Sequence, residues 1–399
     1  MMTLTTLPPL ALYIHVPWCV RKCPYCDFNS HQAPNNLPEQ EYLAALVNDL
    51  TEQLPQVWGR SISSIFIGGG TPSLLSGQGI DHLLAQIRAL IPFQPDIEIT
   101  LEANPGTAEA KKFADFFQAG VNRLSLGIQS FNDGHLQKLG RIHGSRDAYQ
   151  AIEFAHQAGF TRFNIDLMHG LPEQSVAQAE FDLQQALAAG GDHLSWYQLT
   201  LEPNTLFYAK PPQLPADDQL VDIQEAGEAI IAAGGFQRYE ISAFARQASS
   251  RSRHNLNYWT FGDYLAIGAG AHGKITLPAE NQIVRYHQRR SPKDYLDPQQ
   301  SFTRERKVIE VPDLPLEFMM NVLRLTTPVP KAWFFERTGL PLNLIDEALA
   351  RAQSLGLMET SSDSFITTTQ GSAYLNDLLA LFMPDNLAIP APIKVKNIS

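Results

Sequence analysis

The three cysteines of this chain lie within one eight-residue stretch, at Cys19, Cys23 and Cys26. Thiolates this close together can converge on one metal centre, whereas three cysteines cannot pair into disulfides without leaving one over. A [4Fe–4S] cluster usually takes four cysteine thiolates, so three would leave one iron open to another ligand. A structural zinc site completed by His15 or His31 is the alternative that the residues leave open.

The elements that must position these cysteines form a regular alternation between residue 10 and about residue 200. Short apolar runs predict strands at Leu10–Val16, Ser63–Ile67, Ile97–Leu101, Arg123–Gly127, Arg162–Leu167 and His193–Leu199. Amphipathic segments predict helices at Glu39–Leu54, Ile80–Leu90, Ala108–Ala119, Ser145–Ala158 and Ser175–Ala188, with C-capping glycines at Gly120, Gly159 and Gly190. This alternation indicates right-handed βαβ units around a parallel sheet, in the form of a partial (β/α)₆ barrel.

Each predicted strand ends in groups that are chemically useful. The cysteines follow the first strand, and the later strands end in Gly68–Ser73, Glu102 with Asn104, Gln129 with Ser130, Asp166 with His169, and Gln198 with Thr200. Because parallel strands end at the same rim, we expect these groups to share one site. The glycine run matches neither a Walker loop nor a dinucleotide-binding motif, but it would let backbone approach a ligand.

The composition is that of a globular protein of more than one domain, with 399 residues and 44% apolar content. The net charge of −11 argues against general nucleic-acid binding. No apolar run approaches the roughly 18 residues of a membrane span, and Met1–Pro9 lacks the pattern of a signal peptide. We therefore expect a cytoplasmic protein that reaches a membrane only peripherally, through partners.

The cysteine spacing and the glycine run together resemble the radical S-adenosylmethionine (SAM) superfamily. More narrowly, the chain resembles the family of oxygen-independent coproporphyrinogen III oxidase and its haem-chaperone relatives. The matching stretches are Leu12–Cys19, Gly68–Ser73, Asn122–Phe131, Leu139–His143, Asp166–Pro172 and Trp196–Thr205.

The resemblance implies that Cys19, Cys23 and Cys26 ligate a [4Fe–4S] cluster whose open iron is chelated by SAM. The residues that it implies for contact with SAM are Tyr13, Tyr25, Gly69, Gly70, Thr71, Glu102, Gln129, Arg141 and Asp166. Carboxylates suit ribose hydroxyls, and an arginine suits the SAM carboxylate. For Arg141 the alternative is an ordinary charge on a surface helix.

Two departures favour the haem chaperone over the oxidase. The oxidase carries a further cysteine two residues after the third, where this chain has Phe28, and it has a longer N-terminal extension. The expected function is thus to bind haem and deliver it to acceptor haemoproteins, including membrane-bound respiratory ones. Radical decarboxylation of coproporphyrinogen III, or another radical SAM reaction, is the alternative. No catalytic residue is assigned, SAM cleavage stays open, and a homodimer is compatible with the sequence.

A His-Asn-x-x-Tyr-Trp motif at residues 254–259 adds to the resemblance, which implies haem binding there. His254 is the expected ligand, with Tyr258 beside it, since histidine often ligates haem iron. A structural histidine capped by Asn255 is the competing interpretation, and His272 is an alternative ligand.

The predicted domains are a radical SAM core at 1–240, a barrel extension with the motif and a connector at 241–315, a C-terminal domain at 316–383 and a poorly ordered tail at 384–399. The C-terminal pattern predicts helices at Glu317–Leu325, Lys331–Thr338, Leu342–Leu355 and Gln370–Phe382, and a two-stranded wing at Leu357–Thr360 and Ser364–Thr367. Such a winged-helix-like module often reads DNA, but acidic residues outnumber basic ones here. Covering the barrel mouth or docking a partner is the expected role.

Overall fold

The computed structural model describes residues 2–107 and 110–387 and contains one large sheet. Its six central strands are mutually parallel: β1 (Leu10–Val16), β4 (Ile62–Gly69), β5 (Phe93–Ala103), β6 (Arg123–Gln129), β7 (Phe163–His169) and β8 (His193–Gln198). All six strands were predicted, the first with the same bounds. The sheet curves without closing, as expected for a partial barrel.

Further strands extend both edges of this sheet to twelve strands in all. Beyond β1 lie β11 (Asp263–Ile267), β12 (His272–Leu277), β13 (Gln282–Gln288) and β14 (Thr303–Val308), and beyond β8 lie β10 (Ala243–Ala245) and β9 (Gln237–Arg238). Much of the segment interpreted as a connector is therefore sheet. Its prolines all lie outside the strands, where they cost no ladder hydrogen bond: Pro278, Pro292, Pro298, Pro312 and Pro315.

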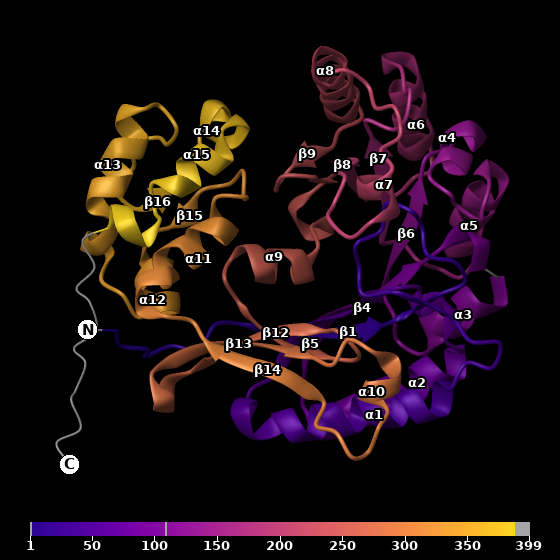
Figure 1. The fold of residues 1–399 in the computed structure, drawn as a ribbon, viewed down its shortest axis with the longest axis horizontal. Helices are drawn as coiled ribbons and strands as arrows, with labels where there is room; N and C mark the ends of the chain where they lie inside the picture. The colour runs from indigo at the N-terminus through magenta and orange to yellow at the C-terminus, as the bar shows by residue number, and fades with distance from the viewer. Residues whose placement is uncertain (1, 108–109, 388–399) are drawn as a thin grey trace.

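Helices cover the outer face of the sheet (Figure 1). They are α1 (Glu39–Gln53), α2 (Gly77–Leu90), α3 (Ala110–Gln118), α4 (Asp133–Lys138), α5 (Ser145–Gln157), α6 (Val176–Ala188) and α8 (Asp217–Ala233), while the short α7 (Leu206–Ala209) lies beside the cysteine loop, where the Phe207 amide donates to Pro24 O at 3.0 Å. The prediction missed α4, α7 and α8, and residues 108–109 of the predicted third helix lie outside the described residues. Gly120, Gly159 and Gly190 take positive φ angles of 101°, 93° and 79°, as expected of C-capping glycines.

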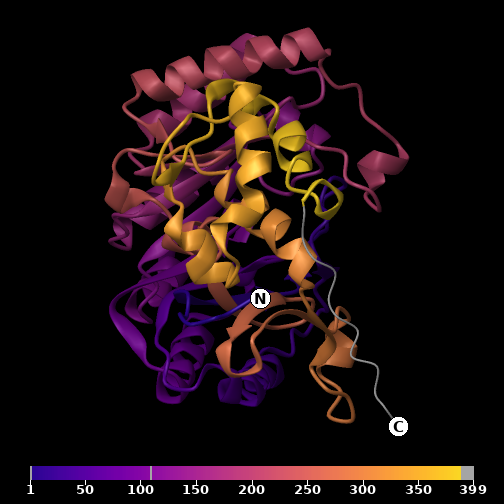
Figure 2. The same ribbon diagram turned by 90° about the vertical axis from the view of Figure 1, so that its left-hand side faces the viewer.

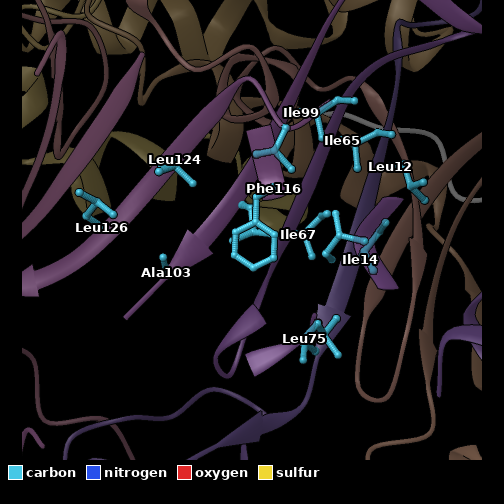
Figure 3. Close-up of a cluster of buried hydrophobic side chains, with 14 of the residues drawn as sticks. Leu12, Ile14, Ile65, Ile67, Leu75, Ile99, Ala103, Phe116, Leu124 and Leu126 are labelled. Carbon is cyan, nitrogen blue, oxygen red and sulfur yellow. The ribbon is translucent and has the colours of Figure 1, made fainter. Parts of the chain in front are cut away.

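The main core lies between the sheet and these helices, as Figure 3 shows. Leu12 and Ile14 of β1 and Ile65 and Ile67 of β4 point to the same side, where Phe116 of α3 packs. This follows from the two-residue period of a strand. The intervening residues face the opposite side, where the polar groups gather.

The C-terminal domain has its own core and lies over the open side of the sheet (Figure 2). It contains α11 (Leu314–Val322), α12 (Ala332–Thr338), α13 (Asp346–Ser354), α14 (Thr369–Ala373) and α15 (Leu375–Ala380), with β15 (Val329–Pro330) paired to β16 (Ser364–Phe365). The predicted wing is only partly correct, since Met358 and Thr367 form a single bridge and β16 pairs with β15. The predicted last helix is broken at Tyr374.

The first described residues belong to this second core. Met2 and Leu4 are buried in it, and the Thr3 amide donates a hydrogen bond to Gly339 O at 2.8 Å. The remaining helices are α9 (Arg253–Trp259), which lies between the sheet and the C-terminal domain, and α10 (Pro292–Tyr295). Across residues 2–107 and 110–387, no helix combines the length and the apolar character needed to cross a membrane.

Candidate functional site

The cysteine loop is closed at its base by two short strands. β2 (Trp18–Cys19) pairs in parallel with β3 (His31–Gln32), and the His31 amide donates to Pro17 O at 2.7 Å. Within the loop, the Asn29 amide group donates to Ala269 O and Arg290 O, each at 2.9 Å. These contacts fix a loop that no disulfide constrains, since all three cysteines are free thiols.

The glycine run packs directly against the start of this loop. The Gly70 amide donates to Val16 O and the Thr71 amide to Trp18 O, both at 2.7 Å. A Cβ atom at Gly70 would lie 2.5 Å from Trp18 O, which is far inside van der Waals contact. Gly69 has a φ angle of 112°, which other residues rarely adopt. Glycine is thus required to bring this backbone beside the cysteines.

The strand ends surround one cavity of about 470 Å³. Its lining includes most of the predicted site residues: Cys19, Cys23, Cys26, Tyr25, Gly69, Gly70, Thr71, Glu102, Gln129, Arg141 and Asp166. Apart from Arg141, which follows α4, they come from the cysteine loop and from β4, β5, β6 and β7 or the residues just after them, as the parallel arrangement requires.

Two carboxyl groups lie on the wall of the cavity. Glu102 Oε2 accepts a hydrogen bond from the Gly69 amide at 3.0 Å, and burial, with the nearby charge of Asp166, raises the pKa of Glu102 to about 8. Asp166 accepts from Ser125 Oγ at 2.8 Å and Asn164 Nδ2 at 2.7 Å, and burial raises its pKa too. Both are oriented acceptors, suited to ligand hydroxyl or ammonium groups.

Arg141 lies in the loop after α4 and faces the cavity, which excludes the alternative of a surface-helix charge. Its Nη2 donates to Gly127 O at 2.7 Å, and its Nη1 lies 3.6 Å from Cys23 Sγ. Gln129 has a positive φ angle of 71° and accepts from Tyr197 OH at 2.9 Å. A non-glycine residue in this conformation is uncommon outside functional sites and turns.

Three predicted site residues lie outside the cavity lining: Tyr13, His254 and Tyr258. The Tyr13 hydroxyl lies 2.9 Å from His15 Nδ1, and the centre of its ring lies 6.3 Å from that of Phe66 and 6.4 Å from that of His254. The physical reason is α9, which packs on β1, β4 and β11 and covers the inner face of Tyr13.

The motif on α9 is divided between two faces of the helix. His254 is 2% exposed, with Nδ1 3.2 Å from Ser64 Oγ and Nε2 3.2 Å from Tyr258 OH, and burial lowers its pKa to about 3. Asn255 and Trp259 line the cavity instead. Residues four apart share a helix face, so each pair points together and the two pairs diverge. A haem-binding role for His254 and Tyr258 stays a prediction.

A zinc site completed by a histidine does not match this geometry. His15 has both ring nitrogens in hydrogen bonds, to Tyr13 OH and to Asn29 O. Nowhere in residues 2–107 and 110–387 are three His, Cys, Asp or Glu side chains gathered as a single ion requires. In a [4Fe–4S] cluster each thiolate binds a different iron, so the sulfurs stand farther apart than around one zinc. Three free thiols facing one cavity fit the cluster.

Sequence reasoning missed several lining residues. Ser195 and Tyr197 alternate with Trp196 on β8 and face the cavity. The two-residue strand period could have found them, because it places both on the side of Gln129 and Asp166. Glu240, Ser242 and Arg324 also line the cavity, but they come from segments with no motif.

Comparisons with known proteins agree with this architecture. A family model described as “Radical SAM superfamily” matches residues 13–185, and one described as “HemN C-terminal domain” matches residues 309–374. The solved structure entitled “Coproporphyrinogen III oxidase (HemN) from Escherichia coli is a Radical SAM enzyme” superimposes with a TM-score of 0.78 at 24% identity, covering 94% of this chain and 90% of that chain. The fold is therefore that of a radical SAM protein with an added C-terminal domain.

Curated relatives narrow this class further. “Heme chaperone HemW” of Escherichia coli is 48% identical over 379 residues, which cover 95% of this chain and 99% of that protein. The protein of the same name from Haemophilus influenzae is 49% identical over 383 residues, and that from Bacillus subtilis is 35% identical over 384 residues, covering 93% of this chain and 98% of that protein. The chain belongs to the HemW family.

Proposed function

We propose that this protein is a haem chaperone that carries a [4Fe–4S] cluster and SAM and delivers haem to acceptor haemoproteins. The observation that carries the proposal is the similarity to proteins named “Heme chaperone HemW”, which extends over 95% of the chain. The same relatives are covered almost completely, so the similarity includes both the cysteine loop and the C-terminal domain.

Cys19, Cys23 and Cys26 would hold the cluster, and the open iron would accept SAM. When bound, this pair supplies reductive cleavage of a C–S bond and an organic radical. The chain's own contribution is to orient SAM through the Gly69–Thr71 backbone and the Glu102 carboxyl group. Arg141 offers a guanidinium beside Cys23, where it can neutralise a ligand carboxylate or thiolate charge.

The direct test is haem transfer. Anaerobically reconstituted protein is loaded with haem and mixed with an apo-haemoprotein, and the acceptor's absorption spectrum is followed. We expect the haem spectrum of the acceptor to appear faster than when the same amount of haem is supplied on an unrelated haem-binding protein. Membrane-bound respiratory haemoproteins are the acceptors that we propose first. Failure to bind haem at all would contradict the proposal.

The same preparation separates the chaperone from the oxidase. Incubation with SAM, a reductant and coproporphyrinogen III should leave that substrate unchanged. Phe28 lines the cavity where the oxidase is expected to carry a further cysteine, and it is 57% exposed. Accumulation of protoporphyrinogen IX would overturn the chaperone assignment in favour of the enzyme.

The haem ligand is tested within the same assay. We propose His254 as a ligand only in a state in which α9 has shifted, since its nitrogens are engaged in the described structure. His254→Ala should then weaken haem binding and change the haem spectrum. His193→Ala is a matched control, because His193 is also buried and hydrogen-bonded at both nitrogens. Equal haem affinity in both variants would remove His254 from the site.

A further inference from the structure

The part of the cavity away from the strand ends is assembled from three distant segments. Ser242 follows β9, Trp259 ends α9, and Arg324 follows α11 in the C-terminal domain. The C-terminal segment is held in place by Thr326, whose amide donates to Tyr239 O at 3.1 Å and whose hydroxyl donates to Arg238 O at 2.8 Å. The Arg324 side chain therefore reaches the cavity from a fixed backbone.

The side chains of Arg324 and Trp259 pack against each other, and each has a hydrogen-bond donor without an acceptor in the described part of the chain. The guanidinium carbon lies 4.8 Å from the centre of the indole ring, and Nε donates to Met320 O at 3.2 Å. Among the described residues, the terminal nitrogens of Arg324 donate no hydrogen bond, and no carboxylate lies within 4.0 Å. Trp259 Nε1 is shielded from water and likewise has no acceptor in the described part of the chain. A buried donor such as this indole N–H is costly to leave without an acceptor, whereas the terminal nitrogens of Arg324 are accessible to a ligand or to water.

Two carboxyl groups of the lining could compete for these donors. Glu202 accepts a hydrogen bond from Thr200 Oγ1 at 2.9 Å, so it already has a partner. Glu240 is 5% exposed, and burial raises its pKa, although Ser242 and the charge of Arg324 oppose that effect. Burial thus opposes the ionisation of Glu240, and neither carboxyl group accepts a hydrogen bond from Arg324 in the described part of the chain.

We propose that Arg324 and the Trp259 indole form a carboxylate-binding subsite for a propionate of the haem. This inference rests on the proposed function and specifies how the same cavity recognises its ligand. A guanidinium offers a planar fork of donors that matches a carboxylate, and its flat face is already oriented by the indole. The indole N–H, which is shielded from water in the described structure, would add one more donor once the ligand uncovers it. The C-terminal domain thereby takes part in ligand recognition.

The test compares haem with its dimethyl ester, in which both propionates are capped. Each is titrated into the full-length wild type, Arg324→Gln and Trp259→Phe under identical cosolvent, and binding is followed by absorption. We expect the wild type to bind haem at least several-fold more tightly than the ester. Arg324→Gln should remove that preference, Arg324→Lys should keep part of it, and Trp259→Phe should reduce it.

A matched control is Arg246→Gln. Arg246 also lies over an aromatic ring, that of Phe236, but it is outside the cavity lining. This variant should keep the full preference for haem. Equal binding of haem and ester by the wild type, or an unchanged preference in Arg324→Gln, would overturn the subsite. If the wild type binds neither compound, the proposed function itself fails.

Discussion

At the cysteine end of the cavity, the two carboxyl groups on the wall already accept hydrogen bonds within the protein, whereas at the other end the Trp259 indole N–H has no acceptor among the described residues. Glu102 is bonded to the glycine run and Asp166 to Ser125. In contrast, the terminal nitrogens of Arg324 and the indole N–H of Trp259 donate no hydrogen bond within the described part of the chain. In the proposed function, the first end is a preorganised cofactor site, and the second end acquires an acceptor from its ligand.

The largest effect should come from a single sulfur atom at the cysteine end. Cys26→Ser should abolish the broad visible absorption of the iron–sulfur cluster after anaerobic reconstitution, because one of three protein ligands is lost. Ser30→Ala is the control, since Ser30 Oγ lies 3.8 Å from Cys26 Sγ without serving as a ligand. If Cys26→Ser kept a cluster with full iron content, Cys26 would not be a cluster ligand as proposed.

A steric change at the same end should have the next largest effect. Gly70→Ala forces a Cβ to within 2.5 Å of Trp18 O, so backbone must move. We expect a loss of about 1–3 kcal/mol or more in the free energy of unfolding, measured with urea, because overpacking of this kind is destabilising. Gly106→Ala is the control, since its Cβ would meet only side chains, at 3.3 Å or more. Similar losses in both variants would contradict the tight contact.

The raised pKa of Glu102 gives a pH-dependent prediction. The folded protein holds this proton up to about pH 8, whereas the unfolded chain loses it near the ordinary value of 4.5. The folded state therefore binds more protons in this window, and stability must fall as pH rises, by at most about 1.4 kcal/mol per pH unit.

Glu102→Gln, which does not titrate, should gain stability relative to the wild type as pH rises from about 4.5 to 8. The check is urea unfolding of both proteins, without cofactors, at several pH values. A constant difference across that range would show that Glu102 has an ordinary pKa.

The smallest effect belongs to the Trp259 end. Glu240→Gln removes a buried carboxyl group whose charge interacts with that of Arg324. Haem should then bind a few-fold more tightly at alkaline pH, where Glu240 is most ionised, and the haem dimethyl ester should be unaffected. Glu228→Gln is the control, because Glu228 pairs with Arg238 outside the cavity lining. Weaker haem binding in Glu240→Gln would reverse the assumed electrostatics.

The sequence predicted the cysteine end of the cavity well, because short local patterns mark the strands whose ends form it. The six strands were marked by apolar runs, and each placed its last residues on a common rim. Residues such as Glu102 and Asp166 needed only the strand period and the parallel arrangement to be found.

The sequence could not predict which site residues would be covered by distant segments, or which residues those segments would add to the cavity lining. Tyr13 was expected in the site, but α9 packs over it from residues more than two hundred positions later. Arg324 had no motif around it and enters the cavity only because Thr326 docks on the β9 region. The helix α8 and the strands β13 and β14 were missed, because charged residues in these segments interrupt their apolar periods.

The attachment of residues 2–6 to the C-terminal domain has a consequence for the order of folding. The Thr6 hydroxyl donates to Glu336 O across 330 positions of sequence, and Met2 and Leu4 complete the same core. Contacts this distant carry a high loop-closure cost and tend to form late. We therefore expect the half of the molecule that carries the cysteines to become ordered first. The domain that carries Arg324 would complete its core later, when residues 2–6 pack against it.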